Sequence, residues 1–385
     1  MPRFCILVIL LCVTIIGHSQ ANLSGTLVDE VTGEPVSFAT VYLDGTSKGE
    51  VTGDDGSFFL RDVALPATLV VSHLNYVNQA LSVTSSSGQL SIRLAPREEV
   101  LAGVEVTDRN LREKTLAEFK LLLLGTDDWG KTSSIRNDEV LRFDRDYVEK
   151  KITVWSENMR TKLLERDNEN ARWSGDGKEY YFDEAVNLKA ATVAPLEIEL
   201  PHLAYVLRMD LNQFRAQYAE GRRAYLGTFF FADSKEVKRK HLRNRQRAYL
   251  GSSMHFARAL LANELPQNGF KIVETVKDEV TKQEAVLEID LRTHLHQVNE
   301  KTWELRGLSG RTFTVLYYAD GKQRPLPPGK WRRSQPAQSS FYIEADRCVI
   351  FAGGVFGDAT IAFSGYMGTR GLAWLLPVDY VYEEE

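Results

Sequence analysis

Cysteine is scarce in this chain, which excludes a fold held together by a disulfide framework. Of three cysteines in 385 residues, Cys5 and Cys12 lie within the first 21 residues and only Cys348 lies beyond them. A chain that lost this first segment could form no intramolecular disulfide bond. Stability must therefore come from hydrophobic cores. With 43% hydrophobic residues, the chain is long enough for roughly two to three domains.

Long apolar runs are also nearly absent, and the one that stands out lies at the N-terminus. Residues 4–16 are apolar, Arg3 precedes them, and the small residues Ser19 and Ala21 follow. The run is shorter than the roughly 20 residues that span a bilayer, so it is typical of a signal peptide over residues 1–21. We expect export to the periplasm or cell envelope, where association with the outer membrane is one option, and a mature chain without a transmembrane span. An uncleaved membrane anchor is the alternative.

The sequence has no excess of positive charge. Its formal net charge of −5 becomes −6 (−5 − 1) when Arg3 leaves with the predicted signal peptide. A general nucleic-acid-binding protein needs a basic surface, so we expect no nucleic-acid partner.

What the chain does contain is a series of short alternating strands over residues 23–94. Ala39, Val41 and Leu43 point to one side of a predicted strand, while Thr40 and Tyr42 point to the other. This period of two is that of a β-strand. Turn residues separate the predicted strands at 32–35, 44–45, 54–56 and 85–88. Six or seven short strands at this spacing predict a β-sandwich.

The same residues resemble a known family. The segments GTLVD at 25–29, TGEPV at 32–36 and DGSF at 55–58 look like the carboxypeptidase regulatory-like domain, a transthyretin-like β-sandwich. The resemblance covers about residues 22–95, and Pro96 with the charged residues after it predicts a domain over 22–96.

The resemblance implies a module that accompanies metallocarboxypeptidases without being their catalytic part. A zinc peptidase of that kind needs a His-x-x-Glu pair. None of the seven histidines is followed by glutamate at that spacing. We therefore predict no catalytic residue, no metal and no cofactor.

Residues 97–385 predict an α+β domain of unknown function, rich in antiparallel strands, so that the whole chain is mainly β with α+β character. Two main helices are expected, one from about residue 108 to Gly125 and one over residues 235–261. Predicted strands cover residues 140–143, 151–155, 188–200, 204–211, 225–231, 285–291, 303–305, 313–318, 341–351 and 361–363.

This second region also resembles a known group of proteins. Residues 195–198, 249–252 and 376–380 are similar to the uncharacterised tail of exported Bacteroidetes-type proteins that carry the sandwich. The resemblance implies no activity. Residues 156–186 are polar, rich in turn residues and fit it poorly, so we interpret them as an insertion.

Three weaker patterns have a plain explanation beside the chemical one. His294 and His296 lie two apart on a predicted strand and could chelate a metal, or simply face solvent. Ser252 and Ser309 lie near glycines, but neither stands in the Gly-x-Ser-x-Gly pattern of an exposed nucleophile. Residues 54–55 are both Asp and could hold calcium, although a β-turn uses the same residues.

The densest positive charge lies in the second predicted helix, where Glu236 is the only acidic residue among seven basic ones. This basic run is either a solvated helix face or a docking site for anionic groups, such as lipid phosphates or an acidic partner protein. Its members are Lys235, Lys238, Arg239, Lys240, Arg243, Arg245 and Arg247.

The sequence thus favours a non-catalytic exported envelope protein with a binding or assembly role, whose partner is an envelope protein or an anionic envelope surface. The alternative is a hydrolase acting on peptides or glycans. Its site would be assembled from residues such as Ser252, His255, Asp210 and Glu197, which no sequence spacing connects.

Overall fold

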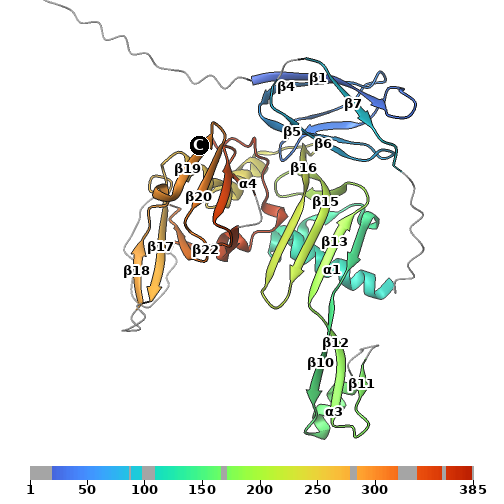
Figure 1. Ribbon diagram of the computed structural model, residues 1–385, viewed down its shortest axis with the longest axis vertical. Helices are drawn as coiled ribbons and strands as arrows, with labels where there is room; N and C mark the ends of the chain where they lie inside the picture. The colour runs from blue at the N-terminus through green and yellow to red at the C-terminus, as the bar shows by residue number, and fades with distance from the viewer. Residues whose placement is uncertain are drawn as a thin grey trace, which may run out of the picture. The chain divides into compact units, whose positions relative to one another are not determined.

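A computed structural model describes residues 20–85, 88–97, 109–165, 171–277, 284–319, 336–357 and 361–383. The chain divides into two compact units, Met1–Asp44 with Lys48–Glu99 and Gly45–Ser47 with Val100–Glu385 (Figure 1). Nearly all of the predicted signal peptide lies outside the described residues, as does the predicted start of the first helix. No helix among the described residues is long and apolar enough to cross a membrane.

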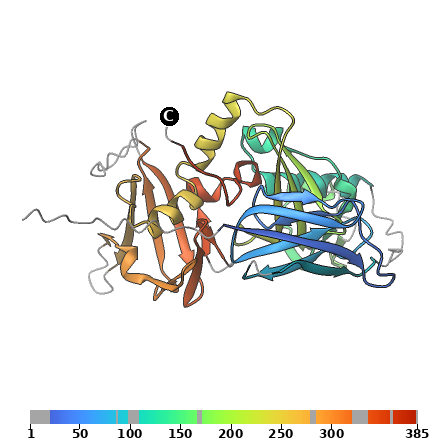
Figure 2. The ribbon, with the colours of Figure 1, turned by 90° about the horizontal axis from the view of Figure 1, so that it is seen from above.

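The first unit is a β-sandwich, as the alternating pattern predicted. Its two sheets contain antiparallel pairs and one parallel pair, β1 with β7 (Figure 2). One sheet has the order β4 (Ser57–Ala64), β1 (Gln20–Asp29), β7 (Leu90–Leu94). The other has the order β3 (Gly49–Val51), β2 (Thr40–Leu43), β5 (Ala67–Ser72), β6 (Gln79–Val83).

Local turn chemistry fixes the register of the sandwich. The carboxylate of Asp29 accepts hydrogen bonds from the backbone N–H groups of Val31 and Thr32, at 2.7 and 2.8 Å, and from the Tyr76 hydroxyl at 2.8 Å. These bonds, that of Thr32 first, lower the pKa of Asp29. Gly56 has a φ of 72°, and a Cβ there would lie 2.5 Å from the carbonyl oxygen of Leu27. The turn therefore requires glycine.

In the first half of the second unit, a six-stranded sheet and several helices pack around one hydrophobic core. The sheet follows the order β8 (Ser134–Ile135), β14 (Leu196–Leu200), β15 (Tyr205–Gln217), β13 (Asn187–Thr192), β9 (Leu141–Asp144), and β16 (Arg222–Asp233) also pairs with β15. Helix α1 (Arg109–Leu124) contributes Phe119 to this core, 5.0 Å from the ring of Phe214. Gly125 follows α1 with a φ of 112°, which confirms the predicted helix end. Helix α2 (Asp128–Thr132) and the 3₁₀ turns η1 (Asp138–Val140) and η3 (Leu372–Trp374) complete this half.

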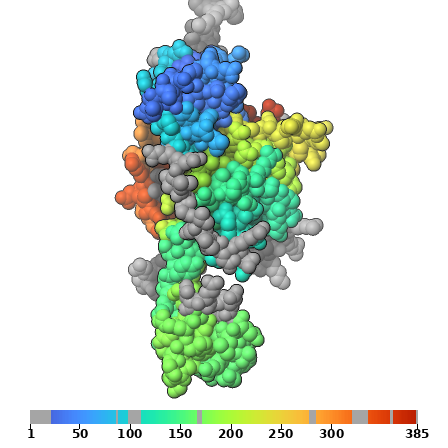
Figure 3. Space-filling view, turned by 90° about the vertical axis from the view of Figure 1, so that its right-hand side faces the viewer, coloured from blue at the N-terminus to red at the C-terminus, as the bar shows by residue number. Residues whose placement is uncertain are grey.

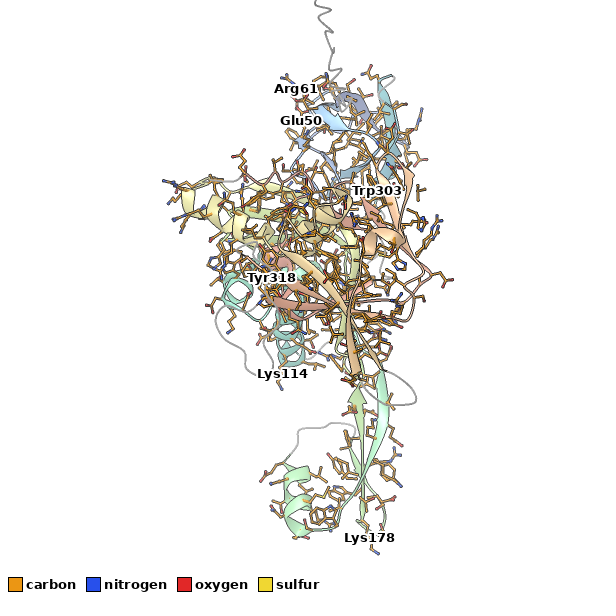
Figure 4. All side chains as sticks on the ribbon, turned by 90° about the vertical axis from the view of Figure 1, so that its left-hand side faces the viewer. Glu50, Arg61, Lys114, Lys178, Trp303 and Tyr318 are labelled. Atoms are coloured by element: carbon orange, nitrogen blue, oxygen red, sulfur yellow. The ribbon has the colours of Figure 1, made fainter. Side chains whose placement is uncertain are left out.

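An arm projects from this sheet, where the β9–β13 pair continues beyond Asp144 and Asn187. The continuation is the antiparallel pair β10 (Tyr147–Thr153) and β12 (Glu179–Ala185), joined by β11 (Arg172–Trp173) and α3 (Glu157–Leu164). The arm extends away from the six-stranded sheet, with Lys178 near its far end (Figures 3 and 4). The predicted insertion at 156–186 thus folds into a helix and two strands, and the strand expected at 151–155 begins four residues earlier.

The second half contains two sheets that share a further core. One has the order β18 (Glu284–Glu288), β17 (Phe270–Lys277), β21 (Thr312–Tyr317), β22 (Ala337–Ile343), β25 (Ile361–Ser364). The other has the order β19 (Leu295–Asn299), β20 (Thr302–Arg306), β23 (Arg347–Phe351), β24 (Val355–Phe356). Helix α5 (Ser253–Leu261) inserts Phe256 between Phe270 and Phe341. The 3₁₀ turn η2 (Leu291–His294) and the short helix α6 (Gly365–Gly368) lie beside these sheets, and Cys348 is buried in their core.

The α+β class is confirmed, but several predicted elements were too long. The helix predicted over 235–261 is two helices, α4 (Arg239–Tyr249) and α5, because Gly251 between them has a φ of 69°. A Cβ at Gly251 would lie 2.6 Å from the ring of Tyr317, so the break is built into the packing. The strands predicted over 188–200 and 341–351 each divide into two, β13 with β14 and β22 with β23.

Candidate functional site

Helix α4 has two opposite faces. His241, Arg245, Ala248 and Tyr249 are buried on one side. A ladder of exposed cations occupies the other side, and Figure 2 shows this helix, in yellow, at the periphery of the second unit. We name it the arginine ladder; its members are Arg239, Arg243 and Arg247, spaced four residues apart, with Lys240 beside them.

The cations of the ladder form no ion pair within the described part of the chain. Among the described residues, no carboxylate oxygen lies within the 4.0 Å of an ion pair from any of its four cations. By contrast, Lys238 just before the helix pairs with Glu236 at 2.8 Å. Unpaired exposed cations on a fixed helix face create a local positive potential in a protein that is acidic as a whole.

The start of α4 depends on a histidine. The ring Nδ1 of His241 accepts a hydrogen bond from the backbone N–H of Lys238 at 3.0 Å, which caps the helix. Burial is the first cause that lowers the pKa of His241, and the neighbouring Lys240 and Arg245 lower it further. The neutral ring is the form that can accept this bond.

Arg245 is a correction to the predicted docking set. Its side chain is buried, its Nε donates to the carbonyl oxygen of Leu203 at 2.8 Å, and its guanidinium pairs with Asp233 at 2.6 Å. The guanidinium also lies 3.7 Å from the ring centre of Tyr205. Two residues advance a helix by about 200°, so Arg245 points away from Arg243 and fixes α4 to the sheet. The other six members of the basic run are exposed.

A stack of aromatic rings supports one end of the ladder. Trp129 and Trp374 are stacked with ring centres 3.8 Å apart, and His202 stacks on Trp129 at 5.1 Å. The guanidinium of Arg247 lies 5.5 and 5.4 Å from the two tryptophan rings. These rings come from segments far apart in the sequence, so sequence reasoning missed the stack. The charge pattern gave no signal for it.

Ser252 and His255, two of the residues suggested for a hydrolase site, instead stabilise the turn at the start of α5. Ser252 caps α5, where its Oγ accepts from the backbone N–H of His255 at 3.1 Å. The buried ring of His255 accepts from Gly251 N–H at 3.1 Å through Nδ1, and its Nε2 lies 3.0 Å from Asn268 Oδ1. Burial is the main cause that lowers the pKa of His255. With both ring nitrogens occupied, His255 has no free position from which to activate a nucleophile.

Glu197 and Asp210, the other residues suggested for a hydrolase site, lie on neighbouring strands of the six-stranded sheet. Glu197 on β14 pairs with Arg208 on β15 at 3.4 Å, and Asp210 lies two residues further along β15. Neither is a partner of the His255 ring.

His294 and His296 do not share a strand, so their predicted placement on one strand was wrong. His294 closes the η2 turn, with its Nδ1 3.0 Å from the carbonyl oxygen of Arg306, and His296 belongs to β19. Within the described ranges, no three His, Cys, Asp or Glu side chains are grouped as a metal site would need.

The remaining weak patterns are turns. Asp55 accepts from the backbone N–H of Ser57 at 3.0 Å, and this neighbour lowers its pKa. Ser309 donates to the carbonyl oxygen of Glu344 at 3.0 Å.

Comparison with known families assigns the first unit. Residues 23–116 match the CarboxypepD_reg-like domain family. The sandwich is a carboxypeptidase regulatory-like domain. The match continues past β7 into α1 and ends well before α4. The family is a regulatory-like domain and not a catalytic one.

Other comparisons add little. Two crystal structures of type II cohesin–X-dockerin complexes from Acetivibrio cellulolyticus, one a C-terminal and one an N-terminal interface mutant, are 22% and 25% identical to this chain. Each match covers 29% of this chain and 79% or 81% of the other, with a TM-score of 0.19. A similarity this weak supports no argument about function. A search of curated proteins gave no match.

Proposed function

We propose that this protein is a non-catalytic exported protein of the cell envelope, and that it binds an anionic partner or surface through the arginine ladder. One observation carries the proposal. Four exposed cations lie on a single face of α4 without a carboxylate partner among the described residues, in a chain whose net charge is −5.

The ladder suits groups that present oxygen anions in a row. Residues four apart on a helix are separated by about 6 Å along its axis, so the three arginines extend over roughly 12 Å. Guanidinium groups bind phosphate and carboxylate oxygens in a bidentate manner. The buried Arg245, the His241 cap and the tryptophan stack hold the helix in place, which reduces the ordering cost of binding.

Export is part of the proposal and rests on the apolar segment before residue 21. N-terminal sequencing of the protein from the envelope fraction tests it directly. We do not propose a hydrolase, because no observation favours one over the structural roles of Ser252 and His255.

The test removes the four positive charges of the ladder and compares the binding of this variant with that of a variant that loses four positive charges elsewhere. One variant carries Arg239→Gln, Lys240→Gln, Arg243→Gln and Arg247→Gln. The control carries four glutamines at exposed lysines on α1, α2, α3 and the arm, namely Lys114, Lys131, Lys162 and Lys178. Both sets are exposed, so each substitution should change stability by at most about 0.5 kcal/mol.

Two probes separate the sources of anionic groups. Sedimentation with phosphatidylglycerol-containing vesicles tests a lipid surface, and binding to poly-glutamate tests an acidic protein. The ladder variant should lose binding to at least one probe by tenfold or more, the control should keep it, and wild-type binding should weaken as salt rises. Equal binding by the two variants would refute the proposed role of α4.

A further inference from the structure

The sandwich has an open side between the edges of its two sheets. A groove of about 570 Å³ lies there, lined by β6 and β7 together with Glu30. At one end the two strands are tied together: Val77 N–H donates to Ala95 at 2.9 Å and Arg97 N–H donates to Asn75 at 2.7 Å. From this closed end the strands run into different sheets.

Among the described residues, β7 has no strand on the side away from β1, so the backbone groups on that side lack a partner there. Glu30 N–H donates to the carbonyl oxygen of Leu94 at 2.9 Å, so the backbone of Leu94 faces β1. Backbone direction alternates along a parallel strand. The N–H and C=O groups of Ser91 and Arg93 therefore point away from β1, toward the free edge.

The edge of β6 is open in the same way. Asp44 N–H donates to the carbonyl oxygen of Thr68 at 2.9 Å, so Thr68 faces β2, and its neighbour Leu69 faces Leu81 of β6. By alternation, the backbone of Ser82 points outward. Open edges of this kind are the usual templates for pairing with another strand.

A buried acceptor in the groove lining lacks a donor. Gln79 lines the groove, and its side-chain Oε1 is shielded from solvent and accepts no hydrogen bond from the described residues. A buried acceptor without a donor costs about 1–3 kcal/mol, so a ligand N–H group placed here would be favoured.

The two sheets of the sandwich differ in width. The sheet containing β7 has three strands and the sheet containing β6 has four. A strand added beside β7 would make the two sheets equal and would fill the groove facing β6.

We propose that the groove binds an extended peptide segment of a partner protein by β-strand addition to β7. The repeating N–H and C=O groups along the edge match an extended backbone, and a five-residue edge spans about 17 Å. The segment would pair with Ser91 and Arg93 and place a donor on Gln79. This inference is independent of the arginine ladder, which lies in the other unit.

The test uses the full mature chain and a panel of short alternating Thr/Val peptides, read by amide hydrogen exchange. Peptide binding should slow exchange at Ser91 and Arg93 at least tenfold, while Leu90 and Ile92, already bonded to β1, change little. Ser91→Pro removes the outward N–H without removing a bond to β1 and should abolish binding. Ser82→Pro, the matching change on β6, should leave binding intact.

Gln79→Leu provides a second test, which does not require that strand β7 tolerate a proline. It removes the orphan acceptor, so we expect about tenfold weaker peptide binding, equal to about 1.4 kcal/mol, with no loss of stability in the free protein. The inference fails if no peptide of the panel protects Ser91 and Arg93. It also fails if Ser82→Pro abolishes binding while Ser91→Pro does not.

Discussion

The sandwich and the second unit bury polar groups in different ways. In the described part of the sandwich, the buried polar side chains are Asp29, Thr52 and Ser72. Thr52 is typical, since its hydroxyl accepts from Ala39 N–H and donates to Val36, both at 2.9 Å. These contacts close loops within the sandwich. The rest of its core is apolar, and the packing of side chains such as Leu27 dominates its stability.

The second unit instead uses arginines to join segments that are far apart in the sequence. Arg258 on α5 donates to the carbonyl oxygens of Gly353, Val378 and Tyr380 at 2.9–3.0 Å. Arg223 on β16 does the same for carbonyl oxygens of α1 and α6, both at 2.8 Å. The sandwich is therefore specified mainly by local pattern. The second unit needs polar contacts that form only once distant segments meet.

The largest expected effect is a cavity in the sandwich. Leu27→Ala removes a fully buried side chain of β1 and should destabilise the sandwich by about 3 kcal/mol, within the usual 2–5 kcal/mol for such changes. All six tryptophans lie from Trp129 onward, so tryptophan emission reports on the second unit. Hydrogen exchange should show that β1 unfolds at a lower denaturant concentration. The midpoint of the unfolding transition followed by tryptophan fluorescence should not change.

The control for this experiment is Leu74→Ala, at a position that is 75% exposed, and we expect no shift from it. If Leu27→Ala lowered the midpoint of the tryptophan transition as well as the stability of the sandwich, the two units would unfold cooperatively. The contrast drawn between them would then be wrong.

The second prediction breaks the arginine contacts. Arg245→Met removes the donors to the carbonyl oxygen of Leu203 and to Asp233. Because a buried carbonyl without a donor costs about 1–3 kcal/mol, we expect the free energy of unfolding of the second unit, followed by tryptophan fluorescence, to fall by about 2 kcal/mol. Hydrogen exchange in the sandwich should be unchanged.

Arg243→Met is the matched control, two residues away on the same helix but exposed and without a partner among the described residues. It should change stability by at most about 0.5 kcal/mol. Equal destabilisation by both variants would mean that burial of Arg245 does not stabilise the second unit.

The same difference explains what the sequence could predict. The sandwich was predicted almost strand by strand, because side-chain alternation and turn residues such as Asp29 act over a few positions. In the second unit the end of α1 at Gly125 was local and correct, but the break at Gly251 reflects packing against Tyr317, which no local pattern contains.

The candidate site shows the same limit. The run of basic residues was visible in the sequence, yet the face that is buried depends on what packs against α4. Leu242, an apolar residue of α4, is 50% exposed, so hydrophobicity along the helix does not mark the buried face. The partners that bury Arg245 come from β15, β16 and the loop before β15, so charge spacing along the helix could not identify it.

The smallest expected effect concerns the buried histidines of the second unit. Burial lowers the pKa of both His241 and His255 in the folded protein, below the 6.5 of the unfolded chain. The unfolded state therefore binds more protons as pH falls below about 6.5, and the folded state loses stability in that window. The slope is at most about 1.4 kcal/mol per pH unit for each histidine. Cations reinforce the effect, Lys240 and Arg245 at His241 and Arg258 at His255.

The double variant His241→Asn with His255→Asn removes both titrating groups while leaving an acceptor oxygen near each Nδ1 position. We expect lower stability at neutral pH but a flatter dependence of the tryptophan transition between about pH 6.5 and 5. His296→Gln, an exposed position on β19, should keep the wild-type slope. If the double variant keeps that slope as well, the acid sensitivity of the second unit comes from other groups, and the buried histidines serve only as hydrogen-bond acceptors for the two helix starts.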